Sequence, residues 1–390
     1  MASPLNPPKR ILLGPGPSNP HPTVLEALSA PVVGHLDPEF FKIMEENKAM
    51  LRRLFHTENE LTFPVSGTGS AGMEACLVNL VEEGDTVLVC INGVFGTRMA
   101  DIVERLGGNL VKVEAPWGEI IRPEQVEQAL KEHKVDIVTL VHAETSTGVL
   151  QPVEEISRLA HDAGALLVLD TVTSLGGCPV TLDAWNVDAA YSGTQKCLSC
   201  PPGLSPVSFG PAARDKLARR KSKVKSWYLD FTMIARYWGE ERAYHHTAPI
   251  SMNYGLHAAL SEIEREGLEA RFARHELNHR ALVAGLEALG IPLASQEGHR
   301  LWMLNSVKIP EGANDGAIRK RLLLDFNIEI GGGLGALAGK TWRIGLMGES
   351  SRKENVVALI EALGQILREE GADVAVEEAL GAIERVYAGE

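Results

Sequence analysis

The sequence predicts an α/β protein whose larger part is a mostly parallel sheet covered by helices on both faces. Between residues 61 and 209, short apolar runs alternate with segments of helical period, a pattern typical of strands joined by crossover helices. The apolar runs are continuous, as expected for strands that are buried on both faces. Glycines and short polar residues follow these runs at the carboxyl ends of the strands, where ligands of such sheets bind. The predicted strands are 61–65, 86–91, 110–113, 137–141, 166–170, 189–192 and 206–209.

The character of the chain changes after about residue 251. Two long, charged helices are predicted over 256–289, with Gly267 and Gly290 as breaks. A βαββα order follows, and apolar residues at helical spacing near the C-terminus predict one last helix. With 390 residues, two domains are expected. We predict an N-terminal arm over 1–17, a large cofactor-binding domain over 18–265 and a smaller α/β domain over 266–390. The segments of the βαββα order are 304–309, 317–326, 328–330, 342–346 and 355–367.

Composition narrows the class of protein. The chain is 45% hydrophobic and 23% charged, which is ordinary for a soluble globular protein. A formal net charge of −13 disfavours nucleic acid as a partner, and the basic run 214–225 is expected to be a solvated helix and its exit. No apolar run approaches the roughly 20 residues that would cross a membrane. The N-terminus lacks the apolar segment of a signal peptide, so the cytoplasm is the expected location.

Two charged residues stand out after predicted strands. Asp170 ends the apolar run 166–170, and Lys196 ends the segment 191–196. A lysine amine can form a Schiff base with an aldehyde, and a carboxylate can hold a pyridinium nitrogen. These are the two protein groups that pyridoxal phosphate chemistry most needs. Taken alone, the two segments fit a surface lysine and a helix-capping aspartate equally well.

The glycine-rich segment 67–72 has the G-x-G-x-x-G spacing of a dinucleotide-binding loop. Such a loop also needs an acidic residue at the end of the second strand to hold the ribose. That strand ends at Asn92, without an acid. The segment is therefore better interpreted as a phosphate cradle at a helix N-terminus.

The cysteines and histidines do not predict a metal site. Five cysteines, an odd number in a large chain, argue against a disulfide framework. Cys197 and Cys200 form a C-x-x-C motif without a second pair, and we expect two buried thiols there. His245 and His246 lack carboxylate or cysteine companions. We expect no metal.

Seven segments in order carry a resemblance that covers most of the chain. With them, the chain resembles the class V aminotransferases, which are pyridoxal phosphate enzymes of fold type I. More narrowly, it resembles the alanine–glyoxylate and serine–glyoxylate or serine–pyruvate aminotransferases. Any one segment is weak, but seven in the same order are specific. The segments are 12–18, 66–69, 144–148, 170–174, 192–196, 244–247 and 342–345.

The resemblance implies roles for the residues that act on the substrate. Lys196 would bond covalently to the cofactor and, once freed, move a proton as general base and then general acid. Asp170 would pair with the pyridine nitrogen and keep it protonated. Arg343 would bind the substrate carboxylate through two parallel hydrogen bonds. Gly16 would contribute to the substrate site.

The resemblance also implies the cofactor-binding residues. Thr68, Gly69, Ser70 and Gln195 match phosphate-binding positions, and Thr145 matches the hydroxyl near the ring oxygen. Backbone amides and polar side chains of this kind suit a dianion.

Further residues are implied around the cofactor ring and across a subunit interface. Phe95 matches the stacking position, where many relatives carry tryptophan, and Val172 also matches a cofactor-binding position. Tyr244 and Thr247 match residues that reach the phosphate of the neighbouring subunit, which implies a homodimer with shared sites. His35 is either near the substrate entrance or structural.

We therefore expect an aminotransferase that moves the amino group of alanine or serine to glyoxylate. The products would be glycine and pyruvate or hydroxypyruvate, and the preferred donor and acceptor stay open. Alternatives are an NAD-dependent oxidoreductase that uses segment 67–72, a class V enzyme that does not transaminate, and a non-catalytic subunit. A cysteine desulfurase is disfavoured, because that chemistry needs a thiol in the C-terminal region and no cysteine follows Cys200.

Overall fold

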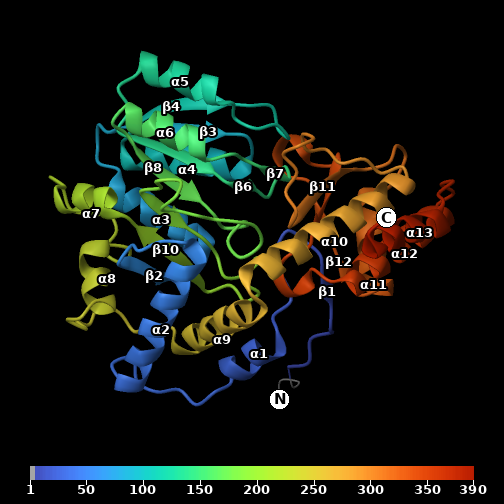
Figure 1. The fold of residues 1–390 in the computed structure, drawn as a ribbon, viewed down its shortest axis with the longest axis horizontal. Coiled ribbons are helices and arrows are strands. Elements are labelled where there is room, and N and C mark those ends of the chain that lie inside the picture. The colour runs from blue at the N-terminus through green and yellow to red at the C-terminus, as the bar shows by residue number, and fades with distance from the viewer. Residues whose placement is uncertain (1–4) are drawn as a thin grey trace.

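A seven-stranded sheet forms the larger part of the molecule in the computed structural model, which describes residues 5–390 (Figure 1). Met1–Pro4 of the predicted arm lie outside the described residues. The strand order is β2-β10-β9-β8-β5-β3-β4, and β10 runs antiparallel to both of its neighbours. The predicted mostly parallel sheet is confirmed. The strands are β2 (Leu61–Ser66), β3 (Thr86–Ile91), β4 (Asn109–Glu114), β5 (Ile137–Val141), β8 (Leu166–Asp170), β9 (Ala189–Tyr191) and β10 (Leu204–Phe209).

Both faces of this sheet are buried. Along β3, Val87 and Val89 pack in one apolar core, while Leu88 and Cys90 pack in another on the opposite face. This alternation follows from the two-residue period of a strand, and it explains why the strands have continuous apolar sequences. Burial of each such aliphatic side chain contributes about 1.5–3 kcal/mol. Helices α3 (Gly69–Leu80), α4 (Val94–Leu106), α7 (Pro211–Ala218) and α8 (Phe231–Trp238) supply the first core, and α5 (Pro123–Glu132) and α6 (Glu154–Asp162) the second.

The helical pattern over 152–163 predicts a helix with Pro152 in its first turn, but this helix begins later. Its first intrahelical hydrogen bond runs from the N–H of Ser157 to the carbonyl of Val153, so Pro152 lies just before the helix. The basic run begins in α7 as expected, and within it Arg214 and Lys216 form ion pairs with acidic residues. None of the helices within residues 5–390 is long and apolar enough to span a membrane.

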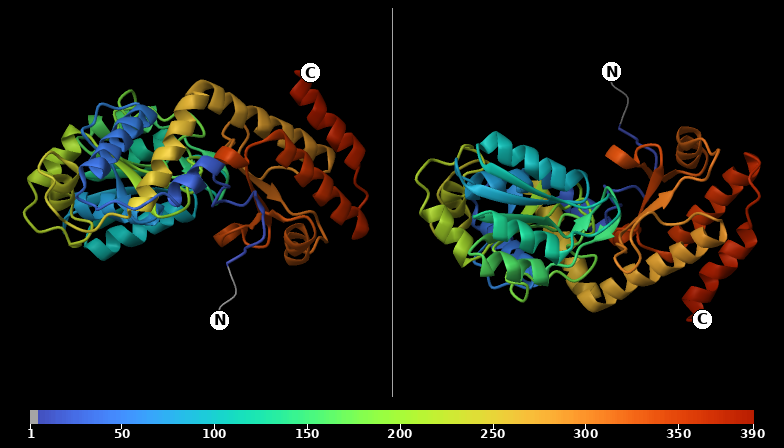
Figure 2. Two further views of the ribbon diagram at one scale, coloured as in Figure 1. Left: turned by 90° about the horizontal axis from the view of Figure 1, so that it is seen from below. Right: turned by 90° about the horizontal axis from the view of Figure 1, so that it is seen from above.

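A second, smaller body follows two consecutive helices. Helix α9 (Ile250–Glu266) packs on the large sheet, and α10 (Leu268–Ala288) runs into the smaller body, as Figures 1 and 2 show. Gly267 separates them with φ of +81°, a conformation that glycine adopts readily. We propose that the domain boundary falls at this glycine, beside the predicted boundary of 265/266.

The smaller body has its own apolar core. A three-stranded sheet, ordered β11-β14-β13, packs against α10, α11, α12 and α13, and the last helix predicted from the sequence is confirmed as α13. The end of the N-terminal arm joins this body, because β1 (Ile11–Leu12) pairs with β12 (Ile328–Glu329). Two short strands, β6 (Ala143–Glu144) and β7 (Val149–Leu150), form a separate hairpin, and α1 (Pro22–Leu28) and α2 (Pro38–Phe55) precede the sheet. The remaining elements are β11 (Leu304–Lys308), α11 (Asp315–Asp325), β13 (Gly331–Gly332), β14 (Thr341–Gly345), α12 (Lys353–Glu369) and α13 (Val376–Ala388).

Candidate active site

The carboxyl ends of the parallel strands meet at one edge of the large sheet, and Asp170 lies there as the last residue of β8. Only 2% of its surface is exposed. One carboxylate oxygen accepts the N–H of Val172 at 2.8 Å, and the other accepts the hydroxyl of Tyr191 at 2.7 Å. Burial raises the pKa of Asp170 to about 7, and these hydrogen bonds oppose that shift. A cation beside this carboxylate would restore its charge.

Lys196 lies at the same edge and is also buried. Its Nζ donates to the carbonyl of Pro15. A Cβ at Gly16 would lie 2.9 Å from that Nζ, so a larger residue would have to displace the lysine side chain, and the φ of +107° favours glycine. Burial, and then the charge of Arg343, lowers the pKa of Lys196 to about 8. An amine with such a pKa is partly neutral near pH 7, as a nucleophile or proton acceptor needs to be.

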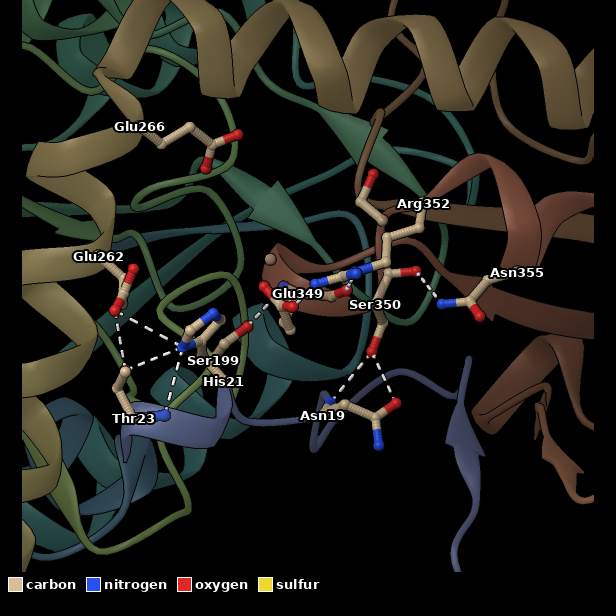
Figure 3. A network of polar contacts seen from close by, with 12 residues as sticks. Asn19, His21, Thr23, Ser199, Glu262, Glu266, Glu349, Ser350, Arg352 and Asn355 are labelled. Carbon is tan, nitrogen blue, oxygen red and sulfur yellow. Dashed lines mark hydrogen bonds and ion pairs between the residues drawn. The ribbon is translucent and has the colours of Figure 1, made fainter. Parts of the chain in front are cut away.

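Two hydrogen bonds to its carbonyl oxygen hold the backbone of Lys196. The hydroxyl of Ser18 donates to the Lys196 carbonyl at 2.7 Å, and the N–H of Ser199 donates to the same oxygen at 3.1 Å. The hydroxyl of Ser199 accepts the N–H of Glu349, which belongs to the smaller body (Figure 3). Beside it, the Ser350 hydroxyl accepts the N–H of Asn19 at 3.0 Å. The lysine therefore lies where the two bodies and the N-terminal segment meet.

A cradle that fits a phosphate lies at the start of α3. Thr68 is the N-cap, and its side chain makes no capping hydrogen bond, so the first amides of the helix are available to an anion. The Ser70 side chain is exposed beside it. Gln195 faces this region from the segment before the lysine, and its buried Oε1 has no partner within the described residues. This oxygen is an acceptor, so Gln195 could bind a phosphate only through its NH2 group. The free amides at the start of α3 are the donors that fit a phosphate group.

The predicted ring-contacting residues also border this edge. Phe95 lies half-buried in the first turn of α4, and Val172 lies half-buried two residues after Asp170. A Cβ at Gly69 would lie 3.3 Å from Val172, so the cradle and the ring-contacting position are neighbours. The Thr145 hydroxyl is buried and shares a hydrogen bond of 2.9 Å with the Thr173 hydroxyl.

Arg343 reaches this edge from β14 of the smaller body. Its Nε donates to the Gly332 carbonyl at 2.8 Å, and Nη1 lies 3.5 Å from the Thr145 carbonyl. Burial lowers the pKa of Arg343 to about 10, so it stays charged near pH 7. With Nε engaged, the two terminal nitrogens remain to bind a carboxylate.

Tyr244 and Thr247 flank His246, whose Nε2 shares a hydrogen bond of 2.8 Å with the hydroxyl of Ser66, two residues before the N-cap of α3. Tyr244 and Thr247 are both exposed, Tyr244 by 62%, and no hydrogen bond within residues 5–390 joins either of them to the phosphate cradle. The His35 ring lies 5.3 Å from the Tyr244 ring, so His35 adjoins this exposed surface, and its role at the substrate entrance stays a prediction.

The C-x-x-C motif does not form a reactive site. Cys197 and Cys200 are free and buried, as predicted, and burial raises the pKa of each thiol to about 12. His245 and His246 share a hydrogen bond of 2.8 Å between their Nδ1 atoms. In the part of the chain that the structure describes, no three His, Cys, Asp or Glu side chains are grouped to hold a metal ion.

Several site residues were missed by the sequence interpretation. Tyr191 faces Asp170 because β8 and β9 pair in that register, and Glu144 lies buried beside the first turn of α4. Arg98 donates to the Ser70 hydroxyl at 3.0 Å and lies 5.0 Å from the centre of the Phe95 ring. A signal for Glu144 was present, since it opens the segment 144–148 that carries the resemblance. Tyr191 opens the segment 191–196 that ends at Lys196, but its contact with Asp170 has no signal in the sequence, and neither has Arg98.

This geometry agrees with the comparisons to known proteins. Residues 19–334 match the family described as aminotransferase class-V. The chain therefore belongs to the class V aminotransferases.

Three relatives are particularly similar to this chain. A solved structure of an alanine–glyoxylate aminotransferase from Nostoc sp. is 51% identical, with a TM-score of 0.93 over 94% of this chain and 98% of that one. A ureidoglycine–glyoxylate aminotransferase from Bacillus subtilis is 41% identical, with a TM-score of 0.97 over 98% and 99%. An alanine–glyoxylate aminotransferase from Rattus norvegicus is 42% identical over 94% of this chain and 90% of its own length.

Proposed function

We propose that this protein is a pyridoxal phosphate-dependent aminotransferase that transfers the amino group of a small L-amino acid, alanine or serine, to glyoxylate. The observation that carries the proposal is the meeting of Lys196, Asp170 and Arg343 at one buried edge. An amine, a carboxylate and a guanidinium are the groups that this reaction needs to hold a cofactor and a substrate carboxylate. The relatives named above, which act on glyoxylate, support the acceptor.

Each of these residues has a defined task. Bound pyridoxal phosphate would supply an aldehyde and an electron-accepting ring. The Lys196 Nζ, with its lowered pKa, would accept the proton that leaves the substrate Cα and donate a proton to the carbon of the cofactor's former aldehyde group. Asp170, held by Val172 and Tyr191, would pair with the pyridine nitrogen and keep it protonated. The two terminal nitrogens of Arg343 orient the substrate carboxylate.

Thr68, Gly69, Ser70 and Gln195 would bind the phosphate, and the Thr145 hydroxyl would lie near the ring oxygen. Phe95 and Val172 would contact the ring, and Gly16 would leave space for the substrate beside the lysine. Phenylalanine at the stacking position offers less area than tryptophan and no N–H donor.

The experiment that tests this function uses the purified protein with added pyridoxal phosphate. We expect a visible absorption band, and after borohydride reduction a pyridoxyl group on the peptide that contains Lys196. Transfer from alanine to glyoxylate should then be measurable as pyruvate. A protein that develops no band and forms no pyruvate would contradict the proposal.

A second donor is favoured by one observation. The Bacillus subtilis relative, 39% identical over 97% of this chain, is named for (S)-ureidoglycine and glyoxylate. Initial rates with alanine, serine and (S)-ureidoglycine, each at the same glyoxylate concentration, would rank the donors. A rate with (S)-ureidoglycine far above the other two would replace alanine and serine as the proposed donors.

We further propose that the protein acts as a homodimer with shared sites. Tyr244 and Thr247 would reach the phosphate in the partner's site. Their exposure in the single chain and their lack of hydrogen bonds to its own cradle, among residues 5–390, support this. The exposed aromatic side chains of Trp227 and Tyr228 lie near the same surface, since the Trp227 ring stacks on His245.

A further inference from the structure

A buried carboxylate lies beside the stacking position of the active site. Glu144, the last residue of β6, has no exposed surface and forms no ion pair within the described residues, although its charge favours the protonated forms of Arg343 and Lys196 nearby. Burial raises the pKa of this carboxyl group, and the hydrogen bonds that it accepts lower it again. A buried carboxylate that forms no ion pair is rare, unless several donors hold it. The donors around Glu144 therefore indicate its purpose.

Those donors come from the first turn of α4 and from Ser146, in the turn that follows β6. The carboxylate accepts the N–H of Phe95 at 3.1 Å and the hydroxyl of Ser146 at 2.5 Å. The Ser146 hydroxyl in turn accepts the N–H of Val94 at 3.0 Å. The N-cap of α4 is Gly93, which has no side chain to cap the helix. Glu144 and Ser146 thus supply, from a distant part of the chain, the cap that this helix lacks.

Gly93 makes this arrangement possible. A Cβ at this position would lie 2.3 Å from Cδ of Glu144 and 2.5 Å from the Ser146 hydroxyl. Any other residue would push the carboxylate away from the amides of α4. The glycine, the serine and the glutamate therefore form one unit that fixes where α4 begins.

We propose that Glu144 is a positioning residue that holds the first turn of α4, and with it the Phe95 ring, where a cofactor ring can stack. The inference rests on the proposed function, because the ring position matters only if a cofactor binds there. Glu144 also contributes negative charge to the site. Burial and Arg343 lower the pKa of Lys196, while Cys197, Asp170 and Glu144 oppose that shift.

The test compares Glu144→Gln with Asp188→Asn. Asp188 is a matched control, because it is a buried carboxylate that accepts the N–H of Leu167 at 2.7 Å near the start of β8, at the opposite edge of the sheet. In the cofactor-free protein, Glu144→Gln should speed amide hydrogen exchange at Phe95 about 10-fold or more, since a charged hydrogen bond is lost. Asp188→Asn should leave that exchange unchanged.

The same variants are then titrated with pyridoxal phosphate. Glu144→Gln should weaken its binding about 10-fold or more, by the same loss of a charge-assisted bond. It should also move the pH midpoint of the lysine-bound absorption band to a lower value, because a negative charge that favours the protonated form is gone. A purely structural cap would not move that midpoint. If Glu144→Gln does not fold, Ser146→Ala, which removes only the bridging hydroxyl, takes its place with the same expected directions in exchange and binding.

Two results would overturn the inference. One is a Glu144→Gln protein whose Phe95 exchange, pyridoxal phosphate affinity and pH midpoint equal those of the wild type. The other is an equal loss of affinity in Asp188→Asn, which would indicate general destabilisation. If the wild type itself never forms the lysine-bound band, the proposed function fails, and faster Phe95 exchange in the cofactor-free variant would still establish that Glu144 holds α4.

Discussion

Two groups of charges, one buried and one partly exposed, differ in how they are paired. At the active-site edge, Lys196, Asp170 and Arg343 form no ion pair with one another within the described residues. At the junction of α9 and α10, Glu266 pairs with Arg271 at 2.6 Å and with Arg274 at 2.5 Å. Burial opposes the charge of Glu266, but the hydrogen bonds and charges of the two arginines outweigh it and lower its pKa to about 2.

The paired arginines at the junction have few hydrogen-bond donors free for a ligand. Besides Glu266, Arg271 donates to the carbonyls of Gly176 and Cys197, and Arg274 donates to the carbonyl of Gly348. These bonds join the end of α9 to the segment after Lys196 and to the smaller body. The active-site charges instead have pKa values shifted toward neutrality, about 7 for Asp170 and about 8 for Lys196. The paired charges at the junction thus stabilise the structure, while the unpaired charges at the active-site edge remain available to bind a ligand.

The largest expected effect comes from Lys196→Ala. Removing the amine removes both the covalent anchor and the proton carrier, so the visible band and nearly all turnover should disappear. Absorption spectra and pyruvate formation measure both. Lys225→Ala is the control, because Lys225 also donates to a backbone carbonyl, that of Leu106, but lies outside the site. A normal band in Lys196→Ala would refute the assignment.

Asp170→Asn should slow the reaction by about 10²-fold or more, because it removes one preorganised charge that stabilises the pyridinium. Pyridoxal phosphate should still bind. Single-turnover rates of the loaded protein with alanine give the comparison. Rates near those of the wild type would mean that Asp170 does not pair with the cofactor ring.

Asp170→Asn should also stabilise the cofactor-free protein. Loss of a paired charge, by contrast, should destabilise it. The folded state raises the pKa of Asp170 from 3.8 to about 7, so it favours the protonated form. Stability from this group is complete below about pH 4 and is lost as the pH rises to about 7. Asparagine at this position cannot ionise, so the variant does not lose this stability as the pH rises. The melting temperature of Asp170→Asn should therefore exceed that of the wild type at pH 8 and approach it at pH 4. A variant that melts lower at both values would contradict this.

An intermediate effect is expected for the proposed shared site. A Tyr244→Ala, Thr247→Ala double variant and Lys196→Ala should each be inactive alone. In mixed dimers, isolated through two different affinity tags, one site carries both lesions and the other is intact. Such dimers should regain about half of the wild-type activity per dimer. Mixed dimers without activity would show that Tyr244 and Thr247 do not act across the interface.

The sequence predicted what local patterns determine. Strand ends with short polar residues marked Asp170 and segment 67–70, and Gly267 was recognised as a helix break. The position of β10 between β2 and β9 was not predictable, because strand order depends on the packing of the whole sheet. The contact of Tyr191 with Asp170 depends on the same order and register. The capping of α4 by Glu144 joins residues 49 positions apart, which no local pattern encodes.

The smallest effect is expected from Glu266→Gln, which breaks the paired group instead of the unpaired one. Because the folded state lowers the pKa of Glu266 from 4.5 to about 2, its charge stabilises the protein above about pH 4.5. That stability is lost as the pH falls toward 2. The variant should therefore melt a few degrees lower than the wild type at pH 7, roughly the effect of 1 kcal/mol, and the difference should shrink below pH 4.

The affinity of Glu266→Gln for pyridoxal phosphate should stay within about 2-fold of the wild type, because Glu266 contacts no predicted site residue. A partly exposed ion pair at the junction of α9 and α10 contributes little to the binding of a distant ligand. Glu262→Gln is the control for the junction, since Glu262 pairs with Arg265 one turn earlier on α9 and touches neither Arg271 nor Arg274. Melting curves at pH 7 and 4, together with a pyridoxal phosphate titration, decide the outcome. If Glu266→Gln weakens pyridoxal phosphate binding as strongly as a change at the active-site edge, the assignment of paired charges to stability and of unpaired charges to ligand binding is wrong.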